Sequence, residues 1–381
     1  METPVASGYG GVYLNMSYPN VTTTENPFAG FQAGKEMVRK VAWFIIILYS
    51  VVFIIGTVGN ALIVITVAWH KSMQNVTNYF IANLAASDFA MCIFCIPWTL
   101  AQTLMDDWIF GEVLCRLVPT IQAVSVFVSI TSHIVIACDR YCLIMYPLRP
   151  RLPRLFCVAI ILLSWVMAVG LAVPILYYTR PYDLRALGYH IICYEHWPDM
   201  EAQRAYNYVL LLVGYVLPLI LIVILYSRIS YLLTRRVLPG VFTEDQERRD
   251  LKKKQKTNRL LIAVVLTFAI CWFPFYTVHA IVNINPRVFG RERFDLIYTM
   301  CHWFAMSSTV YNPFVYAWLH EKYRHQLKSV FTVSCMRQSS LYRSNSRGPA
   351  TQLQTREFYS TNSPRSTRFS SVRSSKGQEV V

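Results

Sequence analysis

The chain has 381 residues, of which 54% are hydrophobic and only 15% charged. This composition is too apolar for a typical soluble domain. The formal net charge of +15 does not indicate nucleic-acid binding, because Lys and Arg concentrate in residues 228–259, after the third apolar segment and in the C-terminal tail. A P-loop, a nucleophile elbow and a His/Glu metal cluster are all missing from the sequence, so we expect neither an enzyme nor a metal site.

Seven apolar segments follow one another along the chain. They lie near residues 41–69, 78–104, 114–145, 155–177, 206–232, 259–283 and 295–319. Each has at least about 20 residues and can cross a bilayer as a helix. These concentrations of Lys and Arg fall on one side of the segments, and the positive-inside rule makes that side cytoplasmic. Lys35, Arg39 and Lys40, before the first segment, favour the opposite orientation weakly. We therefore predict an all-α membrane protein, a seven-transmembrane helix bundle over residues 41–319 with its N-terminus outside the cell.

The predicted topology assigns a role to the N-terminal segment and to two cysteines. Residues 1–40 lack the apolar core of a cleavable signal peptide, and sequons at Asn15 and Asn20 predict glycosylation. Of ten cysteines, only Cys115 and Cys193 fall on the extracellular side. In that oxidising compartment we expect them to form a disulfide.

The second and third apolar segments carry polar groups within the membrane. Asp88 lies near the middle of the second, where an ionisable side chain costs ~2.5 kcal/mol or more and indicates a functional site; a protonated, hydrogen-bonded Asp88 is the alternative. In the third, four polar residues fall within about 20° of one direction on a helix. They are Gln122, Ser129, His133 and Arg140. This face is expected to point into the bundle rather than toward lipid.

The sixth and seventh apolar segments each contain a proline beside polar or aromatic residues. The sixth reads Cys271-Trp272-Phe273-Pro274, and the seventh reads Asn312-Pro313-Phe314-Val315-Tyr316. A proline removes one helical hydrogen bond and bends its helix. We therefore expect a kink at each of these positions.

Together with Asp139-Arg140-Tyr141 at the end of the third segment, these motifs resemble those of rhodopsin-like (class A) G-protein-coupled receptors. The resemblance covers about residues 56–331. Within it, the segment 304–309 and Trp197-Pro198 are similar to neuropeptide Y-type receptors and to their neuropeptide F and RYamide relatives. The sequence departs from the class pattern at Lys254, where an acidic partner of Arg140 is common, and at His133, where an aliphatic residue is usual.

The resemblance implies a plasma-membrane receptor for an amidated neuropeptide that signals through heterotrimeric G proteins, of the inhibitory class by analogy, when the sixth helix moves outward. The switch residues would be Asp139, Arg140, Tyr141, Tyr226, Trp272, Pro274, Asn312, Pro313 and Tyr316. It also implies an allosteric sodium pocket and no other cofactor. The sodium residues would be Asp88, Ser129 and Asn312. A receptor for another peptide (prokineticin or tachykinin type) or for a lipid is the alternative, and a transporter is a remote one.

The resemblance also implies a ligand site, whose floor would hold a C-terminal amide between Gln122 and His302, because a glutamine offers both a donor and an acceptor. The predicted ligand-binding residues are Trp98, Gln102, Gln122, Glu195, Phe275, Tyr276, His279, Asn283, Tyr298 and His302. Vertebrate neuropeptide Y receptors have an Asp where Asn283 stands, and it pairs a ligand arginine. Either Glu195 or Asp199 takes that role here, or the ligand is an RFamide or RYamide relative.

The C-terminal region divides into two predicted parts. Residues 320–335 form an amphipathic helix at the cytoplasmic interface, with Tyr323, Leu327 and Phe331 on one face, and Cys335 is a candidate for palmitoylation. Residues 336–381 are rich in Ser, Thr and Arg and should be disordered, as a tail that is phosphorylated and binds arrestin.

Overall fold

The computed structural model describes residues 7–8, 29–105, 107–148, 150, 152–183, 191–235, 244–285 and 288–319. The predicted glycosylation sites at Asn15 and Asn20, the segment 320–335, Cys335 and the tail 336–381 lie outside the described residues. Six described helical stretches are long and apolar enough to span a membrane: Ala42–Trp69, Val76–Leu104, Gly111–Met145, Arg154–Tyr178, Met200–Thr234 and Leu251–Ile284. The all-α prediction is confirmed.

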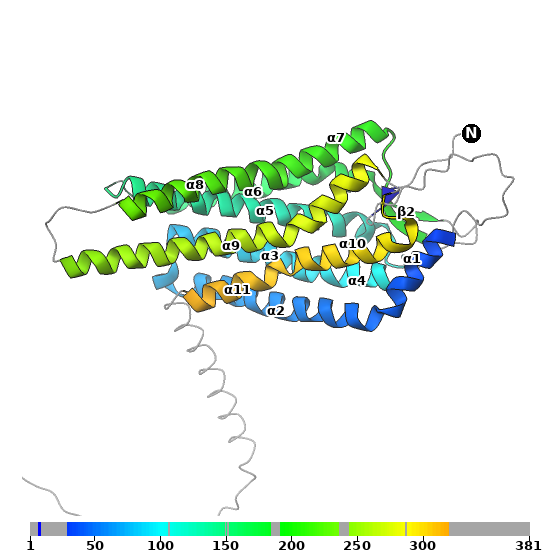
Figure 1. Ribbon diagram of the computed structural model, residues 1–381, viewed down its shortest axis with the longest axis horizontal. Coiled ribbons are helices and arrows are strands. Elements are labelled where there is room, and N and C mark those ends of the chain that lie inside the picture. The colour runs from blue at the N-terminus through cyan, green and yellow to red at the C-terminus, as the bar shows by residue number, and fades with distance from the viewer. Residues whose placement is uncertain are drawn as a thin grey trace, which may run out of the picture. The chain divides into compact units, whose positions relative to one another are not determined.

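The elements are, in order, β1 (Ser7–Gly8), α1 (Ala29–Lys40), α2 (Ala42–Trp69), η1 (Lys71–Met73), α3 (Val76–Phe94), α4 (Ile96–Leu104), α5 (Gly111–Met145), α6 (Arg154–Tyr178), β2 (Thr179–Asp183), β3 (Ile191–Glu195), α7 (Met200–Leu211), η3 (Leu212–Val216), α8 (Leu217–Arg235), α9 (Glu244–Ile284), α10 (Arg291–Met306) and α11 (Ser308–Leu319). Figure 1 shows the long helices lying side by side. The predicted seventh segment is the pair α10–α11, which a turn at Ser307 divides into two pieces, each too short to span alone.

Local chemistry explains where the helices are interrupted. Pro97 occupies the first turn of α4, directly after the break at Cys95. The amide groups of a first turn have no partner within the helix, so the amide hydrogen that proline lacks is not needed there. Pro218 follows the π-helical turn η3, in which the amide of Leu217 bonds to the carbonyl oxygen of Leu212. Such π turns accommodate a backbone that a proline has deprived of its regular partner.

Helix α5 lies at the centre of the bundle and packs against α3, α6 and α8, while α2 packs against α3 and α11 (Figure 1). The contact between α2 and α11 is close because α2 presents glycine there. A Cβ added to Gly59 would lie 2.7 Å from two ring carbons of Pro313. The outer faces remain apolar: Leu162, Leu163 and Val166 of α6 are about 60% exposed or more, as suits side chains that contact lipid.

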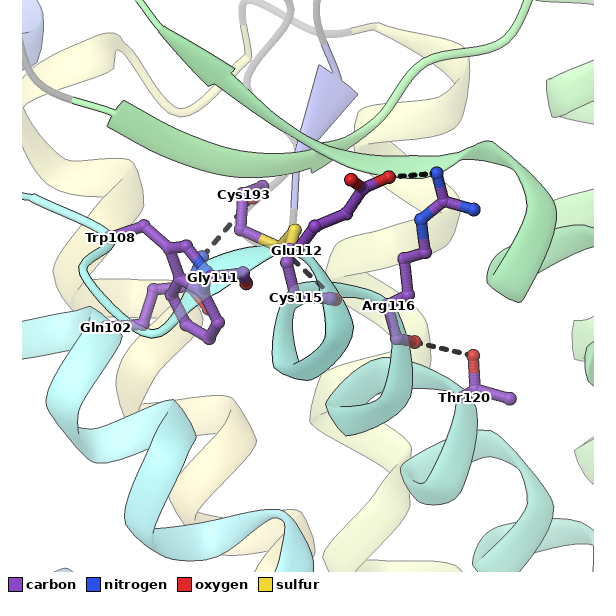
Figure 2. Close-up of a disulfide and its surroundings, with 8 residues drawn as sticks. All are labelled: Gln102, Trp108, Gly111, Glu112, Cys115, Arg116, Thr120 and Cys193. Atoms are coloured by element: carbon purple, nitrogen blue, oxygen red, sulfur yellow. Dashed lines mark hydrogen bonds and ion pairs between the residues drawn. A yellow bond between two sulfur atoms is a disulfide. The ribbon is translucent and has the colours of Figure 1, made fainter.

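A small antiparallel sheet covers one end of the bundle. Its strand order is β1-β3-β2, with Ser7 opposite Glu195 and Thr179 on the other side of the same residue. The predicted disulfide between Cys115 and Cys193 is present and joins β3 to the first turns of α5 (Figure 2). We call this end of the bundle the disulfide end, and the opposite end, where α5 carries Arg140, the Arg140 end.

The N-terminal region contains a helix that the sequence analysis did not separate from the rest of residues 1–40. Helix α1 precedes α2 with a break at Val41 and packs against α10. Val38 is buried, and the ammonium group of Lys35 donates to the carbonyl oxygen of Gln102, 3.5 Å away. These contacts place α1 beside the disulfide end.

Candidate functional site

A pocket of about 130 Å³ lies within the bundle, toward the disulfide end. One water molecule needs roughly 10–15 Å³, so the pocket has room for a substantial ligand group. Side chains from α5, α6, β3, α7, α9 and α10 line it. The predicted ligand-binding residues in this lining are Gln122, Glu195, Phe275, Tyr276, His279, Asn283 and Tyr298. Residues that lie far apart in the sequence thus meet at one cavity.

The floor of the pocket is held by hydrogen bonds that cross three helices. Gln122 of α5 places its Oε1 3.2 Å from Nε2 of His302 in α10. Nδ1 of His302 lies 2.9 Å from the hydroxyl of Tyr49 in α2, which also faces the carbonyl oxygen of Thr299 at 3.3 Å. An amide oxygen only accepts, so Nε2 of His302 carries the proton and Nδ1 accepts from Tyr49. His302 therefore lies behind the lining and supports Gln122.

Aromatic rings form the wall above this floor. The ring of Phe275 lies 4.4 Å from His279 and 5.8 Å from Tyr298, centre to centre. Trp272 lies edge-on to Phe275 at 5.6 Å, and its indole nitrogen donates to Oγ of Ser308 at 3.2 Å. Trp272 thus connects the pocket to the first turn of α11. A ligand group that displaces these rings will act directly on the seventh segment.

The rim of the pocket is polar. Asn207 donates to Oδ1 of Asn283 at 3.2 Å, and Asn283 donates to the carbonyl oxygen of Arg204 at 3.3 Å. Glu195 accepts from the indole nitrogen of Trp197 at 3.0 Å. Burial raises the pKa of the Glu195 carboxyl, and the bond from Trp197 opposes that shift. Among the described lining residues Glu195 is the one carboxylate.

Three predicted ligand-binding residues are not part of the described lining: His302, Trp98 and Gln102. Trp98 packs edge-on against Phe110 at 5.1 Å. Gln102 donates to the carbonyl oxygen of Cys193 at 3.3 Å, beside the disulfide (Figure 2). Both residues of α4 thus support the covering loop and strand. Asp199, the alternative to Glu195, caps α7 by accepting from the amide of Glu201 at 3.0 Å.

The sequence analysis missed the contribution of the C-terminal half of α7 to the pocket. Asn207, Tyr208, Leu210 and Leu211 line it, and none was predicted. Asn207 carries the one signal that sequence offered, because it is an amide at the start of a long apolar run in the fifth segment. The apolar residues carry no such signal, since a residue facing a pocket and a residue facing lipid look alike in sequence.

The predicted sodium residues meet near the middle of the bundle. Asp88 is 3% exposed; it accepts from Asn312 at 2.7 Å and from Ser129 at 3.3 Å. The hydroxyls of Ser87 and Ser129 lie 2.9 Å apart. Asn60 bonds to backbone carbonyls of α2 and α11 instead of to Asp88. Ion pairs of Asp88 with Lys, Arg or His are missing among the described residues, and a carboxylate beside hydroxyl oxygens is a donor set that fits a hard cation.

The predicted switch residues are spread along the bundle: Trp272 lines the pocket and Asn312 contacts Asp88, while Asp139, Arg140 and Tyr141 lie at the Arg140 end. Asp139 accepts from Oγ1 of Thr77 at 2.7 Å, which joins α5 to the first turn of α3. Tyr226 of α8 and Tyr316 of α11 are buried in the core of the bundle. Pro274 and Pro313 lie inside α9 and α11, as expected, and Tyr141 packs against the core. The exposed Lys254 offers Arg140 no acidic partner.

Comparison with known proteins agrees with this arrangement. Residues 59–316 match the family model described as 7 transmembrane receptor (rhodopsin family). The chain is 37% identical over 293 residues to the neuropeptide Y receptor type 2 of Homo sapiens, covering 75% of this chain and 76% of that receptor. It is 38% identical over 293 residues to the type 2 receptor of Cavia porcellus (75% and 76% covered) and 36% identical over 293 residues to the type 6 receptor of Oryctolagus cuniculus (74% and 79% covered). The chain therefore belongs to the rhodopsin family of seven-transmembrane, G-protein-coupled receptors, which are multi-pass proteins of the plasma membrane.

Proposed function

We propose that this chain is a cell-surface receptor for a C-terminally amidated peptide, which enters at the disulfide end and activates a G protein at the Arg140 end. The names of the relatives, neuropeptide Y receptors, support a peptide ligand. The observation that carries the proposal is the floor of the pocket, where His302 holds the side-chain amide of Gln122. An amide fixed in this way is suited to bind another amide.

The hydrogen bonds of Gln122 define what the floor can recognise. Oε1 of Gln122 already accepts from His302 and retains one lone pair, while its NH₂ group donates. A ligand carboxamide matches both groups, since its oxygen accepts from the NH₂ and its nitrogen donates to Oε1. The aromatic wall of Phe275, Tyr298 and His279 suits an aromatic residue directly before that amide.

The rim supports a cationic residue next to the aromatic one. Glu195 supplies the negative charge, and the side-chain oxygen of Asn283 lies on the same rim. Glu195 lines the pocket and Asp199 does not, which supports Glu195 for the role that the sequence left open between these two acids. A desolvated carboxylate pairs well with the guanidinium group of an arginine. The ligand we propose thus ends in Arg, an aromatic residue and an amide.

The direction of signalling follows from the two ends of the bundle. The disulfide end lies outside the cell, because disulfides persist in an oxidising compartment, and the basic connections place the Arg140 end in the cytoplasm. Agonist contacts at Trp272 favour a state in which α9 pivots at Pro274 and opens the Arg140 end to a G protein. We assign the inhibitory class of G protein by resemblance to neuropeptide Y-type receptors, and arrestin to the phosphorylated tail.

We also propose that sodium binds at Asp88 as an allosteric ion. Asp88 and the hydroxyl of Ser129 would hold it, and the ion would supply a positive charge to a carboxylate that is otherwise surrounded by neutral donors. Replacing sodium by a large organic cation in the assay buffer should change agonist affinity on the native chain and leave it unchanged on Asp88→Asn. An equal change of agonist affinity in the native chain and in Asp88→Asn would contradict a sodium site at Asp88.

The test of the proposed function is nucleotide exchange in membranes that contain this chain and an inhibitory-class heterotrimer. The panel holds amidated neuropeptide Y-type, RYamide and RFamide peptides, a tachykinin-type peptide and a set of lipids. Exchange stimulated by an amidated Arg-aromatic peptide is the expected result. Stimulation by lipids alone would overturn the peptide assignment, and solute transport by the purified protein in liposomes would favour the transporter alternative.

A further inference from the structure

His133 occupies an unusual environment in the interior of the bundle. It lies on α5 and is 2% exposed, with Nδ1 2.7 Å from the carbonyl oxygen of Ser129. A carbonyl oxygen only accepts, so Nδ1 must carry the ring proton and Nε2 presents a lone pair. This Nε2 has no hydrogen-bond partner among the described residues. The ring centre lies 5.3 Å from that of Phe268 in α9, so a buried polar acceptor lies beside an apolar ring.

Two buried hydroxyls in the same part of the bundle lack the complementary group. Tyr226 on α8 is 5% exposed and Tyr316 on α11 is 3% exposed. Neither hydroxyl has a hydrogen-bond partner in the part of the chain that the structure describes. Both tyrosines pack in the main hydrophobic core of the bundle, which runs along its whole length and also contains Phe268. Buried polar groups are almost always hydrogen-bonded, and exceptions call for an explanation. Here one unpaired acceptor and two unpaired donors occur together.

The depth of the two tyrosines in the bundle distinguishes between them. In α11, Tyr316 follows Asn312 by one helical turn, and Asn312 donates to Asp88. In α5, His133 follows Ser129 by one turn, and Ser129 also donates to Asp88, so Tyr316 and His133 share one level. Tyr226 of α8 comes one turn before Ser230, which accepts from Asn258 of α9, about three turns from the Phe268 that packs on His133, so Tyr226 lies closer to the Arg140 end.

The course of α11 allows Tyr316 to move. It follows Pro313, which interrupts the helical hydrogen bonds, and the turn at Ser307 separates α11 from α10. The turn is also where Trp272 of the pocket bonds, through Ser308. A change at the pocket therefore has a direct route to the segment that carries Tyr316.

We propose that His133 is a positioning residue for G-protein activation, whose Nε2 accepts a hydrogen bond from the Tyr316 hydroxyl, directly or through one water molecule, in the signalling conformation. Both groups are unpaired in the conformation described here. A bond that forms in only one of two states shifts the population toward that state. The inference rests on the proposed coupling to a G protein but not on the identity of the peptide.

The experiment measures ligand-free nucleotide exchange on an inhibitory-class heterotrimer, at equal surface expression, for a double-mutant cycle. His133→Leu should lower basal exchange about tenfold, because it removes the bond of the signalling state and the unpaired acceptor of the other state. Tyr316→Phe should lower exchange similarly, and the double variant should be no worse than either single one. His133→Gln, which keeps an acceptor, should retain most of the exchange.

Thermal stability in detergent separates this role from a merely structural one. His133→Leu should melt at the same temperature as the native chain or higher, since a buried unpaired acceptor is gone. Tyr226→Phe is the matched control, and its effect should add to that of His133→Leu. Unchanged exchange in His133→Leu, or additive effects of His133→Leu and Tyr316→Phe, would overturn the proposal. If His133→Leu does not reach the surface, His133→Phe replaces it in the same cycle.

Discussion

Replacing the C-terminal amide of a peptide agonist by a free acid should lower its potency at least tenfold. Gln122 and His302 are 4% and 0% exposed, and Nε2 of His302 occupies one lone pair of the Gln122 oxygen. An acid fills the place of the ligand NH₂ with an oxygen, which then faces the remaining lone pair of Gln122. Leaving a buried group without its partner costs about 1–3 kcal/mol, and about 1.4 kcal/mol is tenfold in potency.

Gln122→Glu tests the charge with little change of shape. The new carboxylate still accepts from His302 and from the ligand NH₂, so the amidated peptide should keep part of its potency. Two carboxylates about 4 Å apart repel by about 4 kcal/mol at an effective dielectric constant of 20. The acid should therefore lose roughly a further hundredfold or more, with uptake of a proton by the pair limiting the loss.

The assay is a dose–response matrix of two peptides against three receptors at equal surface expression. Gln122→Leu is the control, because a leucine side chain can form a hydrogen bond with neither the amide nor the acid. The two peptides should therefore have similar potency on this variant. Equal potency of the two peptides on the native chain would refute the reasoning. Discrimination that survives in Gln122→Leu would show that another part of the pocket reads the amide.

Three other changes have expected outcomes that follow from the structure. Arg140→Ala should spare peptide binding and impair nucleotide exchange, and full exchange at matched expression would remove Arg140 from signalling. Glu195→Gln should weaken an Arg-containing agonist about tenfold or more. Because burial raises the pKa of Glu195, affinity on the native chain should fall as the pH is lowered and the carboxylate takes up a proton, with a weaker fall in Glu195→Gln. Gly59→Ala should lower the free energy of unfolding by about 1–3 kcal/mol, since the new Cβ would lie 2.7 Å from Pro313. Gly170 has open space around it, so Gly170→Ala should be tolerated.

The sequence predicted the spans and the disulfide because each depends on local composition or on topology. Apolar length identifies a membrane helix wherever it occurs, and only two cysteines fell on the oxidising side. Helix α1 was missed because its sequence is polar, and because its packing against α10 depends on tertiary structure that local sequence does not show. The turn at Ser307 was missed because neither glycine nor proline marks it, and Ser307, Ser308 and Thr309 can also lie within a membrane helix by bonding to backbone carbonyl oxygens.

The candidate site was predicted in part, and the reason is one of geometry. Family resemblance identified Gln122 and the aromatic wall, yet it grouped His302, Trp98 and Gln102 with residues that line the pocket. Sequence order does not tell whether a side chain faces a ligand or supports the one that does. That distinction depends on the direction in which each side chain leaves its helix. In α4, Gln102 contacts the backbone of Cys193 and Trp98 contacts Phe110.

The hydrogen bonds from Gln122 through His302 to Tyr49 join three helices whose residues lie far apart in sequence, and they constrain how ligand preference can evolve. A substitution at any one of the three leaves a buried group of its neighbour unpaired. Viable variants should therefore carry compensating changes at two or three of these positions, and single changes should be rare among functional receptors in a library randomised at all three. Tyr49 does not line the described pocket. Its identity would nevertheless vary together with the ligand preference of the receptor.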